Sequence, residues 1–244
     1  MPRTIRTFFD PNFQDSHNFI ELDASESFHL VKVLRLEIGD KVEALDGNGM
    51  VYKTIIYDLN NKKLKLSILD KIVFDKPIPQ FEMFISLIKG NRWEDMIRPL
   101  TELGVSRLTP LQTEHSESNL KHKNISEKMV KWKKIAQDAC KQSGNPWLPF
   151  IDKPLEFKDL LLKVNNQEAL FASLSIFSKR IQDIKFTNAK KIKILIGPEG
   201  GWSKKEEDVA REKGLTFFRF SKNTLRVETA AITSLAVARE NFMI

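Results

Sequence analysis

A short glycine-rich segment near the end of the chain has the composition of a ligand-binding turn. GPEGG, residues 197–201, lies between an apolar run and a helical pattern, and it places Glu199 among three glycines. Glycines let the backbone turn tightly and approach a flat ligand closely. The segment lacks the features of a P-loop or a dinucleotide fingerprint, and Glu199 would repel a pyrophosphate. The turn therefore favours a cationic or hydroxylated ligand, unless Glu199 only faces the positive end of the next helix.

A second segment, later in the chain, carries further groups that could do chemistry. LRVET, residues 225–229, places Arg226, Glu228 and Thr229 just before a helix rich in Ala, Ser and Thr. A helix start with few bulky side chains permits close packing of a ligand, or of another part of the chain, on its backbone. S-adenosylmethionine, with its ribose and sulfonium cation, is a ligand of the kind that the glycine turn favours. The alternative is that Arg226 and Glu228 form a surface ion pair of little energetic value.

Both segments lie where the surrounding elements would place a binding site. Buried-strand patterns alternate with amphipathic helical patterns, which predicts an α/β domain with a mainly parallel sheet and helices on both faces. In such sheets ligands bind at the carboxyl ends of the strands, and both segments follow a predicted strand. Ser203 and Glu206 have the spacing of a capping box at the start of one helix. The predicted strands are 81–88, 105–112, 168–175, 191–197 and 215–220, and the predicted helices are 91–104, 124–144, 203–214 and 227–242.

The first part of the chain has a different pattern, which predicts a small β-barrel. Residues 42–73 contain three strand-like runs with tight turn signals between them. A short helix is expected before them, at residues 25–35, with Ser25 or Ser27 as its N-cap.

The connector FDKPIPQ separates the two patterns and predicts two domains, 1–75 and 76–244. Pro77 and Pro79 stiffen this connector. Residues 1–75 contain 10 Lys and Arg against 12 Asp and Glu, although the whole chain carries a net charge of +7. The basic excess therefore lies in the second domain. It favours a polyanionic partner, with simple solubility as the alternative.

The remaining composition indicates a soluble protein without metal. The single Cys140 cannot form an internal disulfide, which favours a reducing, cytoplasmic location. No apolar run approaches the length of a membrane span, and the N-terminus lacks the pattern of a signal peptide. Four scattered histidines and one cysteine make a structural zinc site an unfavourable interpretation.

Four stretches of the chain resemble one family, the ribosomal RNA small subunit methyltransferase E family. IGPEGGWSKKEED and LRVETAAITSLAVA resemble its C-terminal signature. HLVKVLRLEIGDKVEALDGNG and KGNRWEDMIRPLTELGV also agree with it, so the resemblance covers nearly the whole chain in order. These are SPOUT-class enzymes that methylate N3 of a uridine in 16S ribosomal RNA.

The resemblance implies a fold, a cofactor and partners that the patterns do not show. The first domain would be a PUA-like RNA-binding β-barrel, and the second an α/β domain with a trefoil knot. The enzyme would be a cytoplasmic homodimer that uses S-adenosylmethionine on 16S ribosomal RNA within the small ribosomal subunit. The implied cofactor-binding residues are Leu174, Ile196, Gly197, Pro198, Glu199, Gly200, Gly201, Leu225, Arg226, Glu228, Thr229 and Ala230.

Three side chains are candidates for catalysis of methyl transfer to an imide nitrogen. Arg226 could stabilise the uracil anion, and Glu199 or Glu228 could accept the N3 proton directly or through water. Each has a structural alternative, in which Glu228 orients Arg226 and Glu199 holds its loop.

Basic residues are candidates for contact with RNA phosphates, two of them in an N-terminus that has no evident secondary structure. The candidates are Arg3, Arg6, Lys32, Arg35, Lys89 and Arg92, together with a Lys-rich helix between residues 121 and 141 that could equally be a solvated face. Two other functions fit the same residues. The enzyme could methylate another RNA, or the protein could be a non-catalytic RNA-binding factor in ribosome assembly.

Overall fold

The computed structural model describes residues 4–11, 18–60, 63–116, 125–164 and 168–243, so Arg3 lies outside the described residues. The chain divides into two compact units. The first comprises Met1–Lys76 with Gln137–Leu148, and the second comprises Pro77–Ala136 with Pro149–Ile244. The division at Lys76 lies next to the boundary that the two prolines predict. The pattern gives no sign that 137–148 joins the first unit, because a single helix, α3 (Ile125–Ser143), runs across that division.

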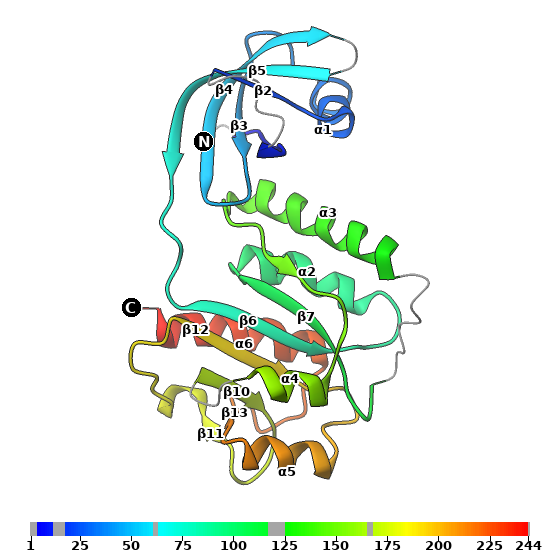
Figure 1. Ribbon diagram of the computed structural model, residues 1–244, viewed down its shortest axis with the longest axis vertical. Helices are drawn as coiled ribbons and strands as arrows, with labels where there is room; N and C mark the ends of the chain where they lie inside the picture. Colours follow the sequence, from blue (N-terminus) through cyan, green and yellow to red (C-terminus); the bar gives the residue numbers. More distant parts are fainter. Residues whose placement is uncertain (1–3, 12–17, 61–62, 117–124, 165–167, 244) are drawn as a thin grey trace. The chain divides into compact units, whose positions relative to one another are not determined.

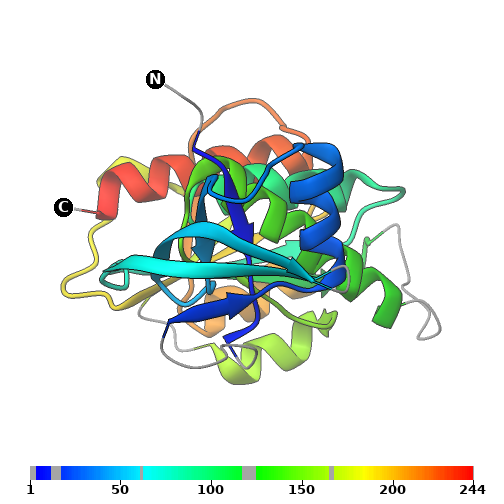
Figure 2. The same ribbon diagram turned by 90° about the horizontal axis from the view of Figure 1, so that it is seen from above.

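The N-terminal unit is built on a five-stranded sheet (Figure 2). A tight turn at residues 46–49 joins two of its strands. Asp46 accepts backbone hydrogen bonds from Asn48 and Met50 at 2.7 and 3.0 Å, and Gly49 has a positive φ of 96°. The order of the strands is β1 (Arg6–Phe8), β3 (Lys41–Leu45), β4 (Met50–Asn60), β5 (Lys63–Val73) and β2 (Phe19–Glu21).

Two details of this unit differ from the sequence-based expectation. The N-cap of α1 (Ala24–Phe28) is Asp23, whose carboxylate accepts the Glu26 N–H at 2.8 Å, so the prediction of Ser25 or Ser27 was wrong. The helical region continues as a π-helical turn, η2 (His29–Val33). Arg6 is not in an unstructured end, since it begins β1, which pairs in parallel with β3. Pairing with a strand so distant in the chain leaves no local sequence pattern.

The C-terminal unit is built on an eight-stranded sheet whose strand pairs are all parallel (Figure 1). Its central strands are almost fully buried, which agrees with their apolar composition. The order of the strands is β11 (Lys179–Arg180), β13 (Thr216–Arg219), β10 (Ala169–Ala172), β12 (Lys191–Ile196), β6 (Gln80–Ser86), β7 (Arg107–Gln112) and β8 (Phe150–Ile151), with β9 (Leu155–Glu156) also paired to β7.

Helices cover both faces of this sheet, as predicted. α6 (Val227–Phe242) packs against α2 (Arg92–Glu102) and against β6 and β12, whereas α4 (Phe157–Lys163) and α5 (Lys204–Glu212) contribute to the core of the other face. The predicted capping box at Ser203 is confirmed, because Ser203 Oγ accepts the Glu206 N–H and Glu206 accepts the Ser203 N–H. A short 3-10 turn, η5 (Ile181–Asp183), follows β11. The short elements α4, β8, β9, β11 and η5 were not predicted.

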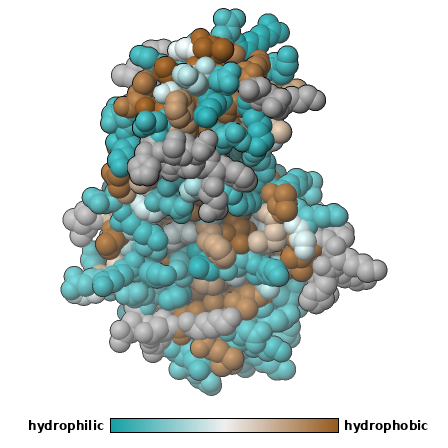
Figure 3. Space-filling model, turned by 45° about the horizontal axis from the view of Figure 1, so that its top comes forward, coloured by the Kyte–Doolittle hydropathy of each residue, from teal (hydrophilic) through white to brown (hydrophobic). Residues whose placement is uncertain are grey.

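Hydrophilic residues cover much of the molecular face in Figure 3, with hydrophobic residues between them. Among the helices that the structure describes, none has the length and apolarity needed to cross a membrane.

Candidate active site

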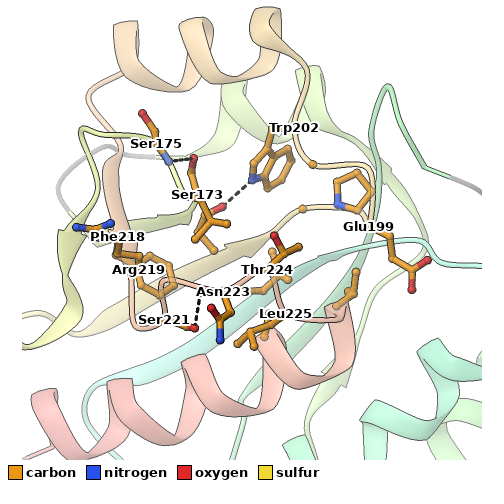
Figure 4. Close-up of a pocket in the computed structure, with 18 of the residues that line it drawn as sticks. Ser173, Ser175, Glu199, Trp202, Phe218, Arg219, Ser221, Asn223, Thr224 and Leu225 are labelled. Carbon is orange, nitrogen blue, oxygen red and sulfur yellow. Dashed lines mark hydrogen bonds between the residues drawn. The ribbon is translucent and has the colours of Figure 1, made fainter.

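A cavity of about 500 Å³ opens at the carboxyl ends of β10, β12 and β13 (Figure 4). Its volume lies in the range typical of small-molecule sites. Residues from the glycine turn, from the loop before α6 and from the segment after β10 all contribute to its wall. The lining residues are Ala172, Ser173, Leu174, Ser175, Ile196, Gly197, Pro198, Glu199, Gly200, Gly201, Trp202, Glu207, Phe218, Arg219, Phe220, Ser221, Asn223, Thr224, Leu225, Val227 and Ala230.

Local geometry explains why two positions of the glycine turn are glycine. The Gly201 N–H donates to the Pro198 carbonyl at 2.9 Å, and Gly201 has a φ of 74°, a conformation that side chains disfavour. A Cβ on Gly197 would lie 2.8 Å from both Cε2 and Nε1 of Trp202. The turn is therefore shaped by its own backbone at one end and by a tryptophan at the other.

Trp202 joins the glycine turn to the wall formed by β10. Its Nε1 donates to the Ala172 carbonyl at 2.8 Å, and its ring stacks on Phe171 with centroids 4.4 Å apart. No local pattern in the sequence indicates a role for Trp202, because both of its contact partners lie about thirty residues away along the chain.

Ser173 links a second wall of the cavity to α5. Its Oγ donates to Glu207 Oε1 at 2.6 Å, and it accepts the Ser175 N–H at 3.0 Å. The Ser173 N–H donates to the Phe218 carbonyl at 3.1 Å, which ties the ends of β10 and β13 together. Sequence reasoning missed Glu207, whose position in the first turn of α5 indicated only a helix start.

The second motif segment contributes to the cavity only in part. Leu225 and Ala230 line it, whereas Arg226, Glu228 and Thr229 do not. Arg226 is the exposed N-cap of α6, between the lining residues Leu225 and Val227. The Oε2 atom of Glu228 is buried and receives no hydrogen bond from the described residues. The chemistry-bearing groups of this segment therefore lie at the margin of the cavity.

Glu199 forms an ion pair with Arg92, the first residue of α2. Figure 4 shows its carboxylate directed away from the other labelled residues of the cavity. The carbonyl of Gly201, on the same turn as Glu199, lies 3.1 Å from Nδ1 of His115 and accepts a hydrogen bond from it. Arg92, predicted to contact RNA, and Glu199, predicted to contact the cofactor, are therefore partners in one ion pair.

The other basic residues predicted to contact RNA have different surroundings. Arg6 is committed to Glu43 at 2.9 Å and to the Lys141 carbonyl at 3.3 Å. Lys32, in η2, and Arg35 are exposed in the N-terminal unit, and Lys89 is exposed shortly before α2. The described residues contain no group of three or more His, Cys, Asp or Glu that could hold a metal ion.

Two family models match the chain, one for each part of it. A model described as RNA methyltransferase PUA domain matches residues 22–69, and one described as RNA methyltransferase domain matches residues 75–239. The second match contains the whole cavity.

Curated relatives and solved structures match over most of their length. The ribosomal RNA small subunit methyltransferase E 2 of Borreliella burgdorferi is 34% identical over 231 residues, 93% of each chain. The ribosomal RNA small subunit methyltransferase E of Synechocystis sp. is 33% identical over 221 residues, 89% of this chain and 71% of that protein. The structure of a methyltransferase from Legionella pneumophila in complex with the bound cofactor SAM has a TM-score of 0.88 at 27% identity, with 98% of both chains covered.

Proposed function

Because the chain belongs to the ribosomal RNA small subunit methyltransferase E family, we propose that it transfers a methyl group from S-adenosylmethionine to N3 of a uridine in 16S ribosomal RNA. The observation that supports this function best is the cavity itself. It lies at the carboxyl ends of parallel strands, where α/β enzymes bind ligands, and both motif segments contribute to it.

The lining of the cavity fits S-adenosylmethionine chemically. Ile196, Leu225 and Ala230 offer apolar contact to an adenine ring, and the glycine turn offers backbone amides and carbonyls without side chains in the way. Glu207 and the hydroxyl of Ser173 are polar groups of the kind that hold a ribose or a cationic centre. When bound, the cofactor supplies a methyl group on a sulfonium cation.

The chain must lower the barrier to removal of the uracil N3 proton. We assign stabilisation of the developing anion to Arg226, because it is exposed between two residues that line the cavity. Of the two candidate proton acceptors, Glu199 is committed to Arg92, whereas Glu228 Oε2 receives no hydrogen bond from the described residues. We therefore assign proton acceptance to Glu228, directly or through water, and a positioning role in the glycine turn to Glu199.

Contact with RNA is proposed for both parts of the chain. A PUA-like barrel in the N-terminal unit is supported by the two register irregularities between β4 and β5, since bulges bend long strands as small barrels require. Lys32 and Arg35 would contact phosphates there, and Lys89 would do so in the C-terminal unit. Arg92 would contribute through its position beside the glycine turn.

A trefoil knot is also proposed for the C-terminal end. After β12 the chain passes β10, so that β13 pairs with β10 on the side away from β12. The chain then returns, and α6 packs against β6 and β12. This return path is what supports a knotted arrangement, which is rare among folds. The proposal also includes a homodimer, a substrate RNA within the small ribosomal subunit and a cytoplasmic location, which the resemblance to the family implies.

Transfer of label from tritiated S-adenosylmethionine to defined RNAs tests the function. The protein is incubated with small ribosomal subunits, large subunits and bulk transfer RNA, each from a strain that lacks the endogenous enzyme. We expect label in the small subunit alone. Label mainly in transfer RNA would contradict the proposed substrate. Absence of thermal stabilisation by saturating S-adenosylhomocysteine would contradict a cofactor site altogether.

A further inference from the structure

Large apolar side chains are exposed directly after β10, next to the cavity. The exposed fractions of Leu174, Ile176 and Phe177 are 50%, 91% and 59%. Leu174 and Ser175 line the cavity, so the exposed residues continue outward from its wall. A cluster of large apolar side chains left in water beside a binding cavity is typical of a contact surface.

The ring of Phe177 is held by an arginine from α5. The guanidinium carbon of Arg211 lies 4.5 Å from the centroid of the Phe177 ring and 5.6 Å from that of Phe217. A cation at this distance over a ring face is attracted to it, which restricts the orientation of the ring. Phe177 is nevertheless 59% exposed, so much of its surface is open to a second flat group.

Several cationic side chains lie near this ring. Lys179 and Arg180 follow it in β11, and Arg180 lies opposite Arg219 in the register with β13. Arg211 has an ion pair with Asp208 at 3.3 Å. A second copy of the chain placed here would bring like charges together, whereas a nucleic acid offers both phosphates and flat bases.

We propose that Phe177, held by Arg211 and flanked by Leu174 and Ile176, is a stacking platform for an unpaired base of the RNA substrate near the target uridine. The inference rests on the proposed function and extends it, because it identifies a surface that recognises the substrate beside the cofactor cavity. Stacking on an aromatic ring holds a base of any sequence, while the nearby cations contact the phosphates.

The test is the dissociation constant for small ribosomal subunits from a strain that lacks the endogenous enzyme. We expect Phe177→Ala to raise it about 5-fold to 150-fold, the range measured for loss of one base–aromatic stack. Phe177→Leu keeps an apolar side chain but no ring face, so it should not restore binding, whereas Phe177→Trp should. The dissociation constant for S-adenosylhomocysteine should stay unchanged in all three, which also shows that each variant is folded.

The chain contains a matched control for this substitution. Phe150 is 58% exposed, and the guanidinium carbon of Arg107 lies 4.6 Å from its ring centroid. These residues begin β8 and β7, at the amino ends of the strands, whereas the cavity lies at the carboxyl ends. Phe150→Ala should therefore leave the affinity for small subunits unchanged.

The outcomes separate the platform from the proposed function. Phe177→Ala protein that binds subunits as wild type does would overturn the platform, even if methyl transfer is observed. Loss of binding in Phe150→Ala to the same extent would overturn it too. A change in sedimentation of the free protein without a change in subunit affinity would assign the surface to a contact between copies. Wild-type protein that binds subunits but transfers no methyl would contradict only the proposed function.

Discussion

Substitution of Gly197 by alanine tests whether Trp202 holds the walls of the cavity together. The new Cβ would lie 2.8 Å from Trp202 Cε2 and Nε1, closer than carbon atoms approach each other, so the indole must move. Its hydrogen bond to the Ala172 carbonyl, now 2.8 Å, and its stack on Phe171 would both be disturbed. Overpacking costs about 1–3 kcal/mol, and a lost hydrogen bond about 0.5–1.5 kcal/mol.

We therefore expect Gly197→Ala to lower the free energy of unfolding by about 2–4 kcal/mol in urea titration. Gly200→Ala is the matched control, because its Cβ would lie 3.4 Å from His115 Cβ, a tolerable contact, and it should cost less than about 1 kcal/mol. Isothermal calorimetry should show that Gly197→Ala raises the dissociation constant for S-adenosylhomocysteine about tenfold or more. Binding must then restore the displaced wall of the cavity, at a free-energy cost of about 1.4 kcal/mol.

A double-mutant cycle with Trp202→Leu decides the cause. If the contact with the indole is responsible, Gly197→Ala should cost less in the Trp202→Leu background than in the wild type. An equal cost in both backgrounds, or a Gly197→Ala protein as stable as wild type, would refute this account of the cavity.

Three further outcomes are expected. Lys141→Met should lower the free energy of unfolding by about 3–5 kcal/mol in urea titration, because it removes the ammonium that lies 2.9 Å from the buried Glu26 carboxylate. Burial raises the pKa of the Cys140 thiol from 9.0 to about 12, so its contribution to stability is present below pH 9 and lost as pH rises toward 12, and a thiol reagent at pH 8 should modify only unfolded protein. Arg92→Ala and Glu199→Gln should weaken S-adenosylhomocysteine binding non-additively in calorimetry, because the two side chains act as a pair.

Each of these expectations has a result that contradicts it. Glu26→Gln added to Lys141→Met should recover part of the lost stability, and a further loss would argue against the buried pair. Rapid modification of Cys140 in native protein would contradict its burial. Additive effects of Arg92→Ala and Glu199→Gln would show that the two side chains hold the turn independently.

Local patterns predicted the elements that carry the site. The apolar run before the glycine turn forms β12, the capping box at Ser203 starts α5, and α6 begins and ends at Val227 and Phe242 as its pattern indicated. These features depend on neighbouring residues, so a single sequence is enough to identify them.

The contacts that shape the cavity could not be predicted in the same way. Trp202 reaches Ala172, Ser173 reaches Glu207, and Arg92 reaches Glu199 across 30, 34 and 107 residues of chain. Pairings over such distances follow from the order of the strands, and that order leaves no periodic signal in the sequence. For the same reason no local pattern indicated that Glu199, which also lines the cavity, pairs with Arg92 of α2.

Nucleoside mass spectrometry tests the central claim most directly. Small ribosomal subunits from a strain that lacks the endogenous enzyme are treated with the protein and S-adenosylmethionine, and their 16S RNA is digested to nucleosides. We predict N3-methyluridine after treatment with wild-type protein, and a large reduction with Arg226→Ala at saturating cofactor. Absence of N3-methyluridine from subunits treated with folded, cofactor-binding wild-type protein would contradict the account.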